Sequence, residues 1–310
     1  MQKKTSNDEP LVIYNSAAVK KVAVRVSWVS IIVNVLLSLG KFVAGLLAAS
    51  GAMVSDAVHS FSDVISSALV MFGVSMAAKA EDESHPYGHE RLECVTALLL
   101  AALLFVTGLG IGVSGIQNIS RALAGELAAP GALALWAALI SIAVKEGMYW
   151  YTKAAADKTK SGALLADAWH HRSDALSSVG SFCGILGARL GWPILDPLAA
   201  LIICCFILKV AWDIAKDSFD KMVDHACDKD MVEQIRSVVH NTAGVLSVDD
   251  LKTRRFGSKS YVDVEIGVDC QLNIVDAHDI AQKVHDNIER TLPEVKHCMV
   301  HVNPNFSECQ

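Results

Sequence analysis

The chain lacks the features that mark several classes of protein. Its 310 residues include 27 Lys and Arg against 33 Asp and Glu, a formal net charge of −6, so it has no basic surplus for binding nucleic acid. None of its eight cysteines form a Cys-x-x-Cys pair, and we expect mostly reduced or buried thiols in place of a disulfide framework. We expect no cleavable signal peptide, because the N-terminus is polar and the first apolar run is too long.

Apolar sequence, by contrast, is abundant, since 52% of the residues are hydrophobic and only 19% are charged. Most of it lies before residue 215, in six runs that each reach the roughly 20 residues needed to cross a bilayer. The runs are approximately 24–48, 52–78, 94–117, 131–153, 164–189 and 193–214. We therefore predict an all-α membrane bundle of six helices over residues 24–214, preceded by a cytoplasmic segment, residues 1–23.

The last third of the chain, residues 215–310, has the composition of a soluble domain. Its pattern predicts helix, strand, strand, helix and strand, in that order. The five elements fall at 230–241, 248–256, 259–268, 276–292 and 297–302. This is a small α+β domain, to which dimerisation would add buried surface.

Lys and Arg are unevenly distributed between the two sides of the predicted membrane segments. They gather before the first segment, between the second and third, and between the fourth and fifth, whereas the other side has only Arg121 and Arg189. Because positive residues favour the cytoplasmic side, we expect both termini and the soluble domain to be cytoplasmic.

One motif, Asp-Ala-x-His-x-x-Ser-Asp, occurs twice inside these segments, at residues 56–63 and 167–174. Its histidine and second aspartate, four residues apart, share one helix face. They are His59 and Asp63 in the first copy and His170 and Asp174 in the second. Ionisable residues are costly in a membrane, and two imidazoles with two carboxylates suit a tetrahedral Zn²⁺ site. The alternative is hydrogen bonding between helices without a metal.

Such a site would also couple metal to protons. Metal binding requires neutral imidazoles and ionised carboxylates, so loading expels protons and protonation expels metal. Histidine titrates near physiological pH, which suits this exchange. The pattern therefore favours Zn²⁺/H⁺ antiport.

Several other polar residues lie near the two motifs. Asp56 and Asp167 each precede a motif histidine by three residues, where they would either accept a hydrogen bond from its imidazole and so orient it, or cap a helix end. Lys145 and Glu146 are adjacent in sequence and so cannot share a helix face. We expect structural roles for this pair.

Two further clusters have the spacing of metal ligands. Asp82, His85 and His89, in the loop after the second segment, either bind a metal or belong to a solvated acidic loop. The soluble domain offers a second group, which is either a regulatory metal site or a set of surface polar residues. Its members are Asp249, Glu265, His278, His285, His297 and His301.

Together, the six apolar runs, the repeated His-x-x-x-Asp, the Asp-x-x-His-Pro-Tyr-Gly-His loop and the soluble domain resemble the cation diffusion facilitator family. The resemblance implies a homodimeric exporter of divalent metal, typically zinc, working by alternating access in exchange for protons, with a metallochaperone-like cytoplasmic domain. It implies a transport site at the two motifs and a loop site at Asp82, His85 and His89. It also implies metal at the cytoplasmic dimer interface, at Asp249, Glu265, His278 and His301.

Arg91 and Asp224 fall where such relatives form a charge pair that locks two protomers together, and an Arg–carboxylate pair can be bidentate. The chain departs from relatives that have His at Asp249 and Glu265 and Asp at Asn303, so weaker or harder-metal binding is expected there. It also lacks a long His-rich loop before the fifth segment, which indicates a prokaryotic plasma-membrane type.

We therefore expect a transporter of Zn²⁺, not an enzyme, with Zn²⁺ as cargo and regulatory ligand. His59 favours zinc, since relatives with Asp there accept iron, cadmium or manganese. The alternative hypotheses are transport of another divalent metal (Fe²⁺, Cd²⁺, Co²⁺, Ni²⁺ or Mn²⁺) and a non-transporting metal sensor or scaffold. A membrane metalloprotease is disfavoured because the chain has no His-Glu-x-x-His motif.

Overall fold

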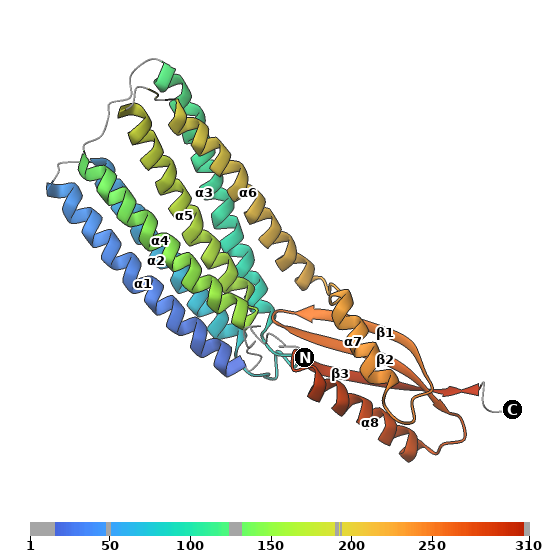
Figure 1. The fold of residues 1–310 in the computed structure, drawn as a ribbon. Helices are drawn as coiled ribbons and strands as arrows, with labels where there is room; N and C mark the ends of the chain where they lie inside the picture. Colours follow the sequence, from blue (N-terminus) through green and yellow to red (C-terminus); the bar gives the residue numbers. More distant parts are fainter. Residues whose placement is uncertain (1–15, 48–50, 124–131, 190–191, 193, 307–310) are drawn as a thin grey trace, which may run out of the picture. The chain divides into compact units, whose positions relative to one another are not determined.

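A computed structural model describes residues 16–47, 51–123, 132–189, 192 and 194–306. The chain divides into two compact units, Met1–Ser218 and Phe219–Gln310. The first unit consists of long helices, and the second combines strands and helices (Figure 1). The predicted domain boundary after residue 214 lies inside the last long helix, which continues to Met222.

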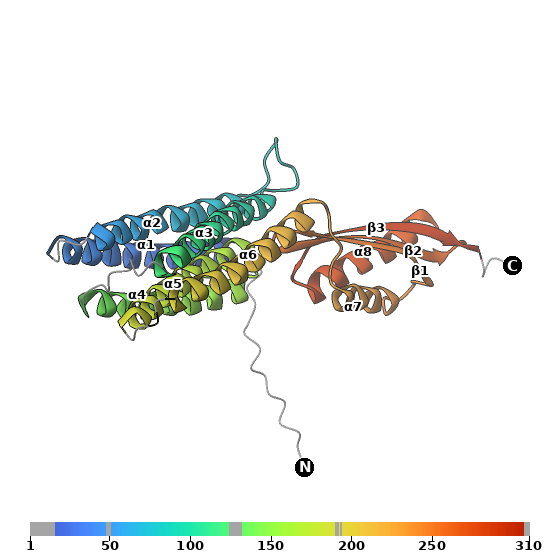
Figure 2. The same ribbon diagram turned by 90° about the horizontal axis from the view of Figure 1, so that it is seen from above.

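The first unit contains six long helices within the described residues. They are α1 (Ser16–Leu47), α2 (Gly51–Ala77), α3 (Arg91–Leu123), α4 (Ala132–Thr159), α5 (Gly162–Arg189) and α6 (Leu195–Met222). Figures 1 and 2 show them lying side by side with their axes roughly parallel. Helix α5 packs against α2, α3 and α4, and α1 packs against α2 and α4. The repeated motifs on α2 and α5 are thereby brought to neighbouring helices.

Small residues allow these helices to approach closely. Ala23 of α1, Ala101 of α3 and Ala163 and Ala166 of α5 are at most 1% exposed within the core of this unit. Glycine acts similarly between α2 and α3, since a Cβ atom on Gly73 would lie 1.9 Å from Thr96 Oγ1. Small residues at helix contacts are typical of membrane bundles, where close packing replaces the hydrophobic effect.

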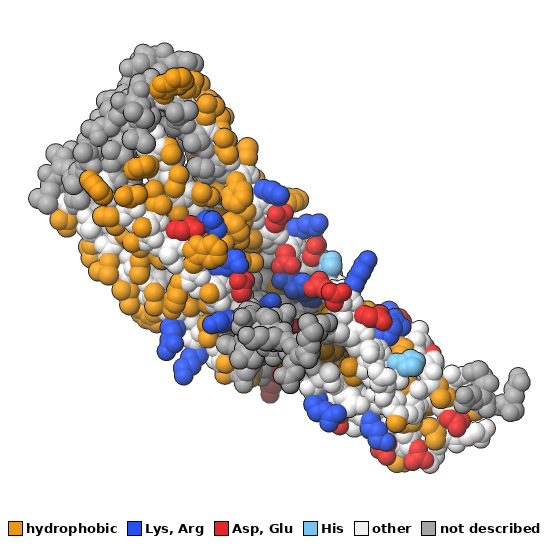
Figure 3. Space-filling model, viewed as in Figure 1, with side chains coloured by type: hydrophobic (Ala, Val, Ile, Leu, Met, Phe, Trp, Pro, Cys, Tyr) orange, Lys and Arg blue, Asp and Glu red, His pale blue; other side chains and the backbone are white. Residues whose placement is uncertain are grey.

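The outer surface of the helical unit is apolar. Hydrophobic side chains cover much of the helical unit in Figure 3. Leu36, Phe72 and Val106 are each at least 64% exposed. Within the described residues, two helical stretches are long and apolar enough to cross a membrane, Ala17–Val43 and Arg91–Arg121. The count of six membrane spans therefore stays a prediction. Helix α5 carries Asp167, Arg172 and Asp174, whose charges lower its hydropathy.

The second unit contains a three-stranded sheet and two helices, in the order predicted from the sequence. They are α7 (Lys229–His240), β1 (Ser247–Phe256), β2 (Lys259–Asp269), α8 (Ile274–Thr291) and β3 (Val295–Asn305). The strand order is β1-β2-β3, with β1 antiparallel and β3 parallel to β2. Helix α8 forms the crossover that a parallel pair requires.

Alternation along β2 separates a buried face from an exposed one. Val262, Val264, Ile266 and Val268 are at most 3% exposed and belong to one core with residues of α7 and α8. Asp263, on the other face, is exposed. Because both helices contribute to the same core, the opposite face of the sheet is left for polar side chains.

The cysteines follow the expectation of free thiols with one exception. Cys94, Cys183, Cys204, Cys205, Cys227 and Cys298 are free. Burial raises the pKa of the Cys298 thiol to about 12, so it is inert. Cys270 is disulfide-bonded, which corrects the expectation at that position. Cys309 lies outside the described residues.

The turn between α7 and β1 depends on Gly244, whose φ is +96°. A Cβ atom there would also lie 2.6 Å from Ile280 Cδ1 of α8. We expect Gly244→Ala to destabilise the second unit by about 1–3 kcal/mol. Amide hydrogen exchange of β2 and α8 in the full-length protein should become faster, while Ala243→Ser, at the exposed neighbour, leaves it unchanged. Equal exchange in Gly244→Ala and wild type would contradict this prediction.

Candidate functional site

Three of the four transport-site candidates converge inside the helical unit. Asp63 comes from α2, and His170 and Asp174 come from α5 one turn apart. Each offers one ligand atom, and these atoms all lie within 4.8 Å of one another. The residues are 2%, 3% and 6% exposed, respectively, and Asp63 Oδ1 lies 3.4 Å from His170 Nε2. Carboxylate oxygen and imidazole nitrogen are ligands for Zn²⁺, and imidazole also suits Fe²⁺.

The first copy of the motif is only partly described. His59 lies one turn before Asp63 on α2, but its side chain and that of Asp56 lie outside the described residues. The geometry above therefore covers Asp63, His170 and Asp174.

His170 has the unsatisfied character of a metal ligand. Within the part of the chain that the structure describes, neither of its ring nitrogens makes a hydrogen bond of good geometry, although Nε2 lies 3.4 Å from Asp63 Oδ1. A buried polar group without a partner is costly, so it marks a place where a ligand would restore the lost interaction. A divalent ion held by Asp63, Asp174 and the His170 imidazole would do so.

Lys145 of α4 lies in direct contact with both carboxylates. Its Nζ atom donates to Asp63 Oδ2 at 2.5 Å and to Asp174 Oδ2 at 2.9 Å, and its side chain is 2% exposed. Glu146 points elsewhere and pairs with Arg172 at 3.4 Å. The adjacency of Lys145 and Glu146 correctly indicated that they occupy different helix faces. It did not indicate that Lys145 contacts Asp63 and Asp174, which are 82 and 29 residues away in the sequence.

Asp167 is fully buried near this cluster, yet it does not hydrogen-bond to His170. Among the ion pairs of the described residues, Asp167 pairs with His171, whose Nε2 lies 3.6 Å from Asp167 Oδ2. His171 Nε2 also lies 3.3 Å from Ser30 Oγ of α1. An orienting role of Asp167 towards His170 therefore stays a prediction.

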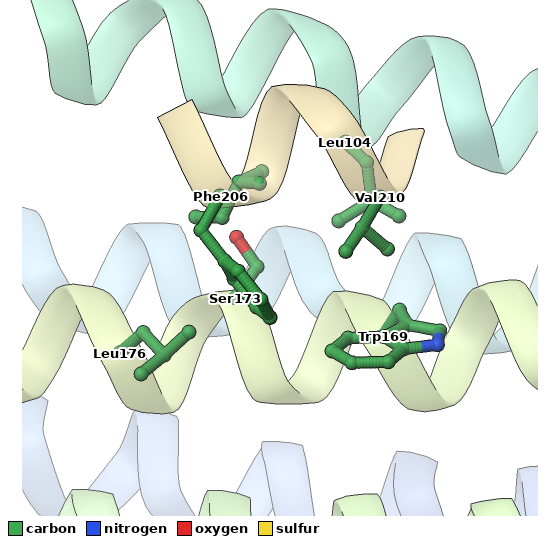
Figure 4. A pocket seen from close by; sticks show the side chains of 7 residues that line it. Leu104, Trp169, Ser173, Leu176, Phe206 and Val210 are labelled. Carbon is green, nitrogen blue, oxygen red and sulfur yellow. The ribbon is translucent and has the colours of Figure 1, made fainter. Parts of the chain in front are cut away.

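A second face of α5 is mostly apolar. Trp169, Ser173 and Leu176, spaced at helical intervals, line a small cavity together with residues of α3 and α6 (Figure 4). Leu104, Phe206, Ile207 and Val210 complete the lining. The Trp169 and Phe206 rings lie 5.8 Å apart between centroids. The described lining of the cavity includes no ionisable residue, so the ionisable side chains of α5 lie away from it.

The loop candidates form a second cluster. One ligand atom each from Asp82, His85 and His89 lie within 4.8 Å of one another. His85 Nδ1 lies 3.1 Å from Asp82 Oδ1, and His89 Nε2 lies 3.4 Å from Asp82 Oδ2. A backbone bridge between Asp82 and His85 and the positive φ of Gly88 (92°) fold the loop back on itself. Lys79 Nζ also donates to Asp82 Oδ2, at 2.6 Å.

The cytoplasmic candidates are only partly gathered. Asn303 Nδ2 donates to Asp249 Oδ2 at 3.1 Å and to Glu265 Oε2 at 3.2 Å. A register shift between Val248 and Asp250 takes Asp249 out of the strand ladder, as in a β-bulge. His301 lies beside Glu265 across the β2–β3 pair. Within the described part of one chain, Asp249, Glu265, His278 and His301 do not form a cluster as tight as the two above.

The remaining candidates are the residues of the charge pair. Arg91 begins α3, and Asp224 follows α6 in a left-handed conformation with φ of 61°. They belong to different units, so their pairing stays a prediction.

Comparison with known proteins assigns this arrangement to a family. The chain matches the Cation efflux transmembrane domain over residues 27–223 and the Cation efflux protein, cytoplasmic domain over residues 227–305. It therefore belongs to the cation efflux (cation diffusion facilitator) family, and the resemblance seen in its motifs is confirmed. It is a membrane transporter for the efflux of divalent metal cations.

Relatives come from archaea, bacteria and plants. An uncharacterized transporter of Methanocaldococcus jannaschii is 37% identical over 274 residues, covering 88% of this chain and 95% of that protein. The Bacillus subtilis manganese efflux system protein MneS is 35% identical, covering 89% of this chain and 93% of that protein. Metal tolerance protein C1 of Arabidopsis thaliana is 37% identical, and the chain spans 60% of its length. A solved MamM CTD variant covers 25% of this chain and 94% of its own, with 21% identity and a TM-score of 0.25.

The loop geometry gives a pH-dependent prediction. Hydrogen bonds from Lys79 and His85 hold the pKa of the Asp82 carboxyl well below its usual range. A carboxyl with a pKa lowered by folding stabilises the loop above its usual pKa of about 3.9, and this contribution is lost as the pH falls through the lowered value. We expect Lys79→Met to raise the Asp82 pKa towards the usual value. High salt should do the same, because the Lys79–Asp82 pair is solvent-exposed.

The measurement is a ¹³C NMR titration of the Asp82 carboxyl in the full-length protein with metal chelated. Lys153→Met, which removes a lysine paired with Asp157 on α4, is the matched control and should leave the Asp82 pKa unchanged. An Asp82 pKa that stays equally low in Lys79→Met would show that the backbone of the loop, and not Lys79, sets it.

Proposed function

We propose that this transporter is a Zn²⁺/H⁺ antiporter that moves Zn²⁺ out of the cytoplasm by alternating access. Its transport site would consist of His59, Asp63, His170 and Asp174. The observation that carries the proposal is the convergence of Asp63, His170 and Asp174 from two helices in the apolar interior. Ligands on separate helices can be parted by moving one helix, which is what a carrier needs and a closed structural site does not.

The same ligands support proton coupling. Metal binds the ionised carboxylates and the neutral imidazole, so a metal ion and protons compete for the same atoms. Protons arriving from the far side of the membrane would then displace the metal, and loading from the cytoplasm would release protons again. Histidine is the side chain best suited to this exchange near neutral pH.

Manganese is the second candidate cargo. Two Bacillus subtilis relatives, at 29% and 35% identity, are named manganese efflux system proteins. Asp63 and Asp174 supply the carboxylate oxygens that Mn²⁺ favours, whereas imidazole favours Zn²⁺. Both ions therefore belong in one transport assay.

The rest of the proposal concerns the whole transporter in its membrane. Both termini would be cytoplasmic, in a prokaryotic plasma membrane, and two chains would form a homodimer. Asp82, His85 and His89 would bind a loop metal. The cytoplasmic domain would bind regulatory metal weakly at Asp249, Glu265, His278 and His301, because Asn303 already bridges the two acids. Asp56 and Asp167 would support the motif histidines.

Proteoliposome flux tests the transport site. Wild-type protein should move Zn²⁺ inward against protons reported by an internal pH-sensitive dye. Asp63→Ala and Asp174→Ala should reduce both fluxes to the background of empty vesicles, because each removes a carboxylate ligand. Mn²⁺ in place of Zn²⁺ in the same vesicles measures which ion is preferred.

Asp157→Ala is the control, because it removes an exposed carboxylate of α4 and should leave flux unchanged. Zn²⁺ flux without proton movement would exclude antiport while leaving the site intact. Undiminished flux in both aspartate variants would place the transport site elsewhere.

The proposed charge pair predicts a rescue. Arg91→Glu or Asp224→Arg alone should lower the fraction of dimer, because each leaves like charges facing one another across the protomers. The double variant restores an opposite-charge pair and should recover the dimer. Native mass spectrometry of the detergent-solubilised protein measures the fraction. Equal loss in the single and double variants would exclude a direct pair.

A further inference from the structure

The transport-site candidates include a cation supplied by the protein itself. Lys145 is 2% exposed, and its ammonium contacts one oxygen of Asp63 and one of Asp174. Both contacts are short, at 2.5 and 2.9 Å. Lysine is almost never fully buried unless it is paired, and this one is paired with the two carboxylates expected to hold the cargo.

A metal ion and the ammonium cannot occupy these oxygens together. Zn²⁺ binds a carboxylate oxygen at about 2.0–2.2 Å. The longer lysine contact, from Nζ to Asp174 Oδ2, is 2.9 Å. An ion bound to that same oxygen would therefore lie at most about 5 Å from Nζ, the sum of the Zn–O bond and the lysine contact. Two positive groups this close in a low-dielectric interior repel strongly. Metal binding through these two oxygens therefore requires Lys145 to withdraw.

Asp167 provides a destination for the withdrawn ammonium. It precedes His170 by three residues and Asp174 by seven, which places all three along one face of α5. Asp167 is 0% exposed, and neither carboxylate oxygen has a hydrogen-bond partner among the described residues. Lys145 and Asp167 lie on α4 and α5, two helices that pack against each other. Lysine has a flexible four-carbon stem, which can redirect its charge along α5 without moving the helix.

We propose that Lys145 is a tethered competitor for the transported metal. It neutralises Asp63 and Asp174 between transport events and transfers to Asp167 when a metal ion binds. This inference rests on the proposed transport site and adds a residue that sets metal affinity without ligating the metal. The lysine lowers affinity and speeds release, because its return to the carboxylates compensates their charge as the ion leaves.

Zn²⁺ binding to the full-length protein in detergent tests the competition. Zn²⁺ can also bind at the loop and cytoplasmic clusters. Binding at the transport site is therefore taken as the part of the total Zn²⁺ binding that Asp63→Asn removes. Lys145→Met, similar in size but uncharged, should tighten this component about tenfold. In proteoliposomes the same variant should lower both KM and kcat for Zn²⁺ flux, since release becomes slower. Lys153→Met on the same helix should leave binding and flux unchanged.

A double-mutant cycle tests the destination. Asp167→Asn removes the alternative acceptor and should weaken Zn²⁺ binding, because displaced Lys145 then has no carboxylate to join. In the Lys145→Met background the same change should have no effect on binding. An Asp167 that acts only by orienting His170 would weaken binding equally in both backgrounds. Where Lys145→Met folds poorly, Lys145→Gln supplies the uncharged background for the same cycle.

The outcomes separate this inference from the proposed function. Lys145→Arg keeps the charge and should keep binding within the wild-type range. In one outcome, Asp63→Asn loses Zn²⁺ binding and flux, but Lys145→Met binds Zn²⁺ as wild type does or more weakly. This would overturn the competitor role of Lys145 and leave the proposed transport site intact. Unaltered binding and flux in Asp63→Asn would overturn the transport site itself, and the competitor with it.

Discussion

The burial of two carboxylates inside an apolar helical unit is the constraint on which the rest of the structure depends. Asp63 and Asp174 are almost inaccessible to solvent, and ionised groups in such surroundings need opposite charge close at hand. Lys145 supplies it from α4, which in turn requires α2, α4 and α5 to lie close together. The alanines of the core permit this approach, and the apolar face of α5 towards Phe206 keeps the charges to one side.

Periodicity predicted the parts of the structure that depend on local spacing. The four-residue interval placed His170 and Asp174 on one face, and the repetition of the motif indicated that α2 and α5 would meet. Alternation in β2 predicted its buried and exposed faces. Contacts between distant segments were not predictable in this way. Lys145 lies on a third helix with no motif of its own, and only its position as a charge inside an apolar run marked it. Asp167 was expected either to orient His170 or to cap a helix end, and spacing along the sequence did not indicate that its carboxylate lies 3.6 Å from His171 Nε2.

The cytoplasmic candidates show the same arrangement with weaker chemistry. The amide of Asn303 bridges Asp249 and Glu265 much as the ammonium of Lys145 bridges Asp63 and Asp174. An amide brings no net charge, and the acids it joins are solvent-accessible, so the contact involves little electrostatic energy. The register shift between Val248 and Asp250 leaves Asp249 outside the regular pairing of β1 with β2.

Lys145 also affects how the transporter responds to membrane potential. Two ionised aspartates alone would carry two negative charges through the electric field whenever a carrier reorients without cargo. With the ammonium between them, the cluster carries one negative charge. The electrical work of moving the second charge, about 2.3 kcal/mol at 100 mV, then no longer opposes or assists this reorientation. The buried lysine thus makes the return of an unloaded carrier less electrogenic and moves that charge to the loaded stroke, while the net charge per cycle is still set by the ions exchanged.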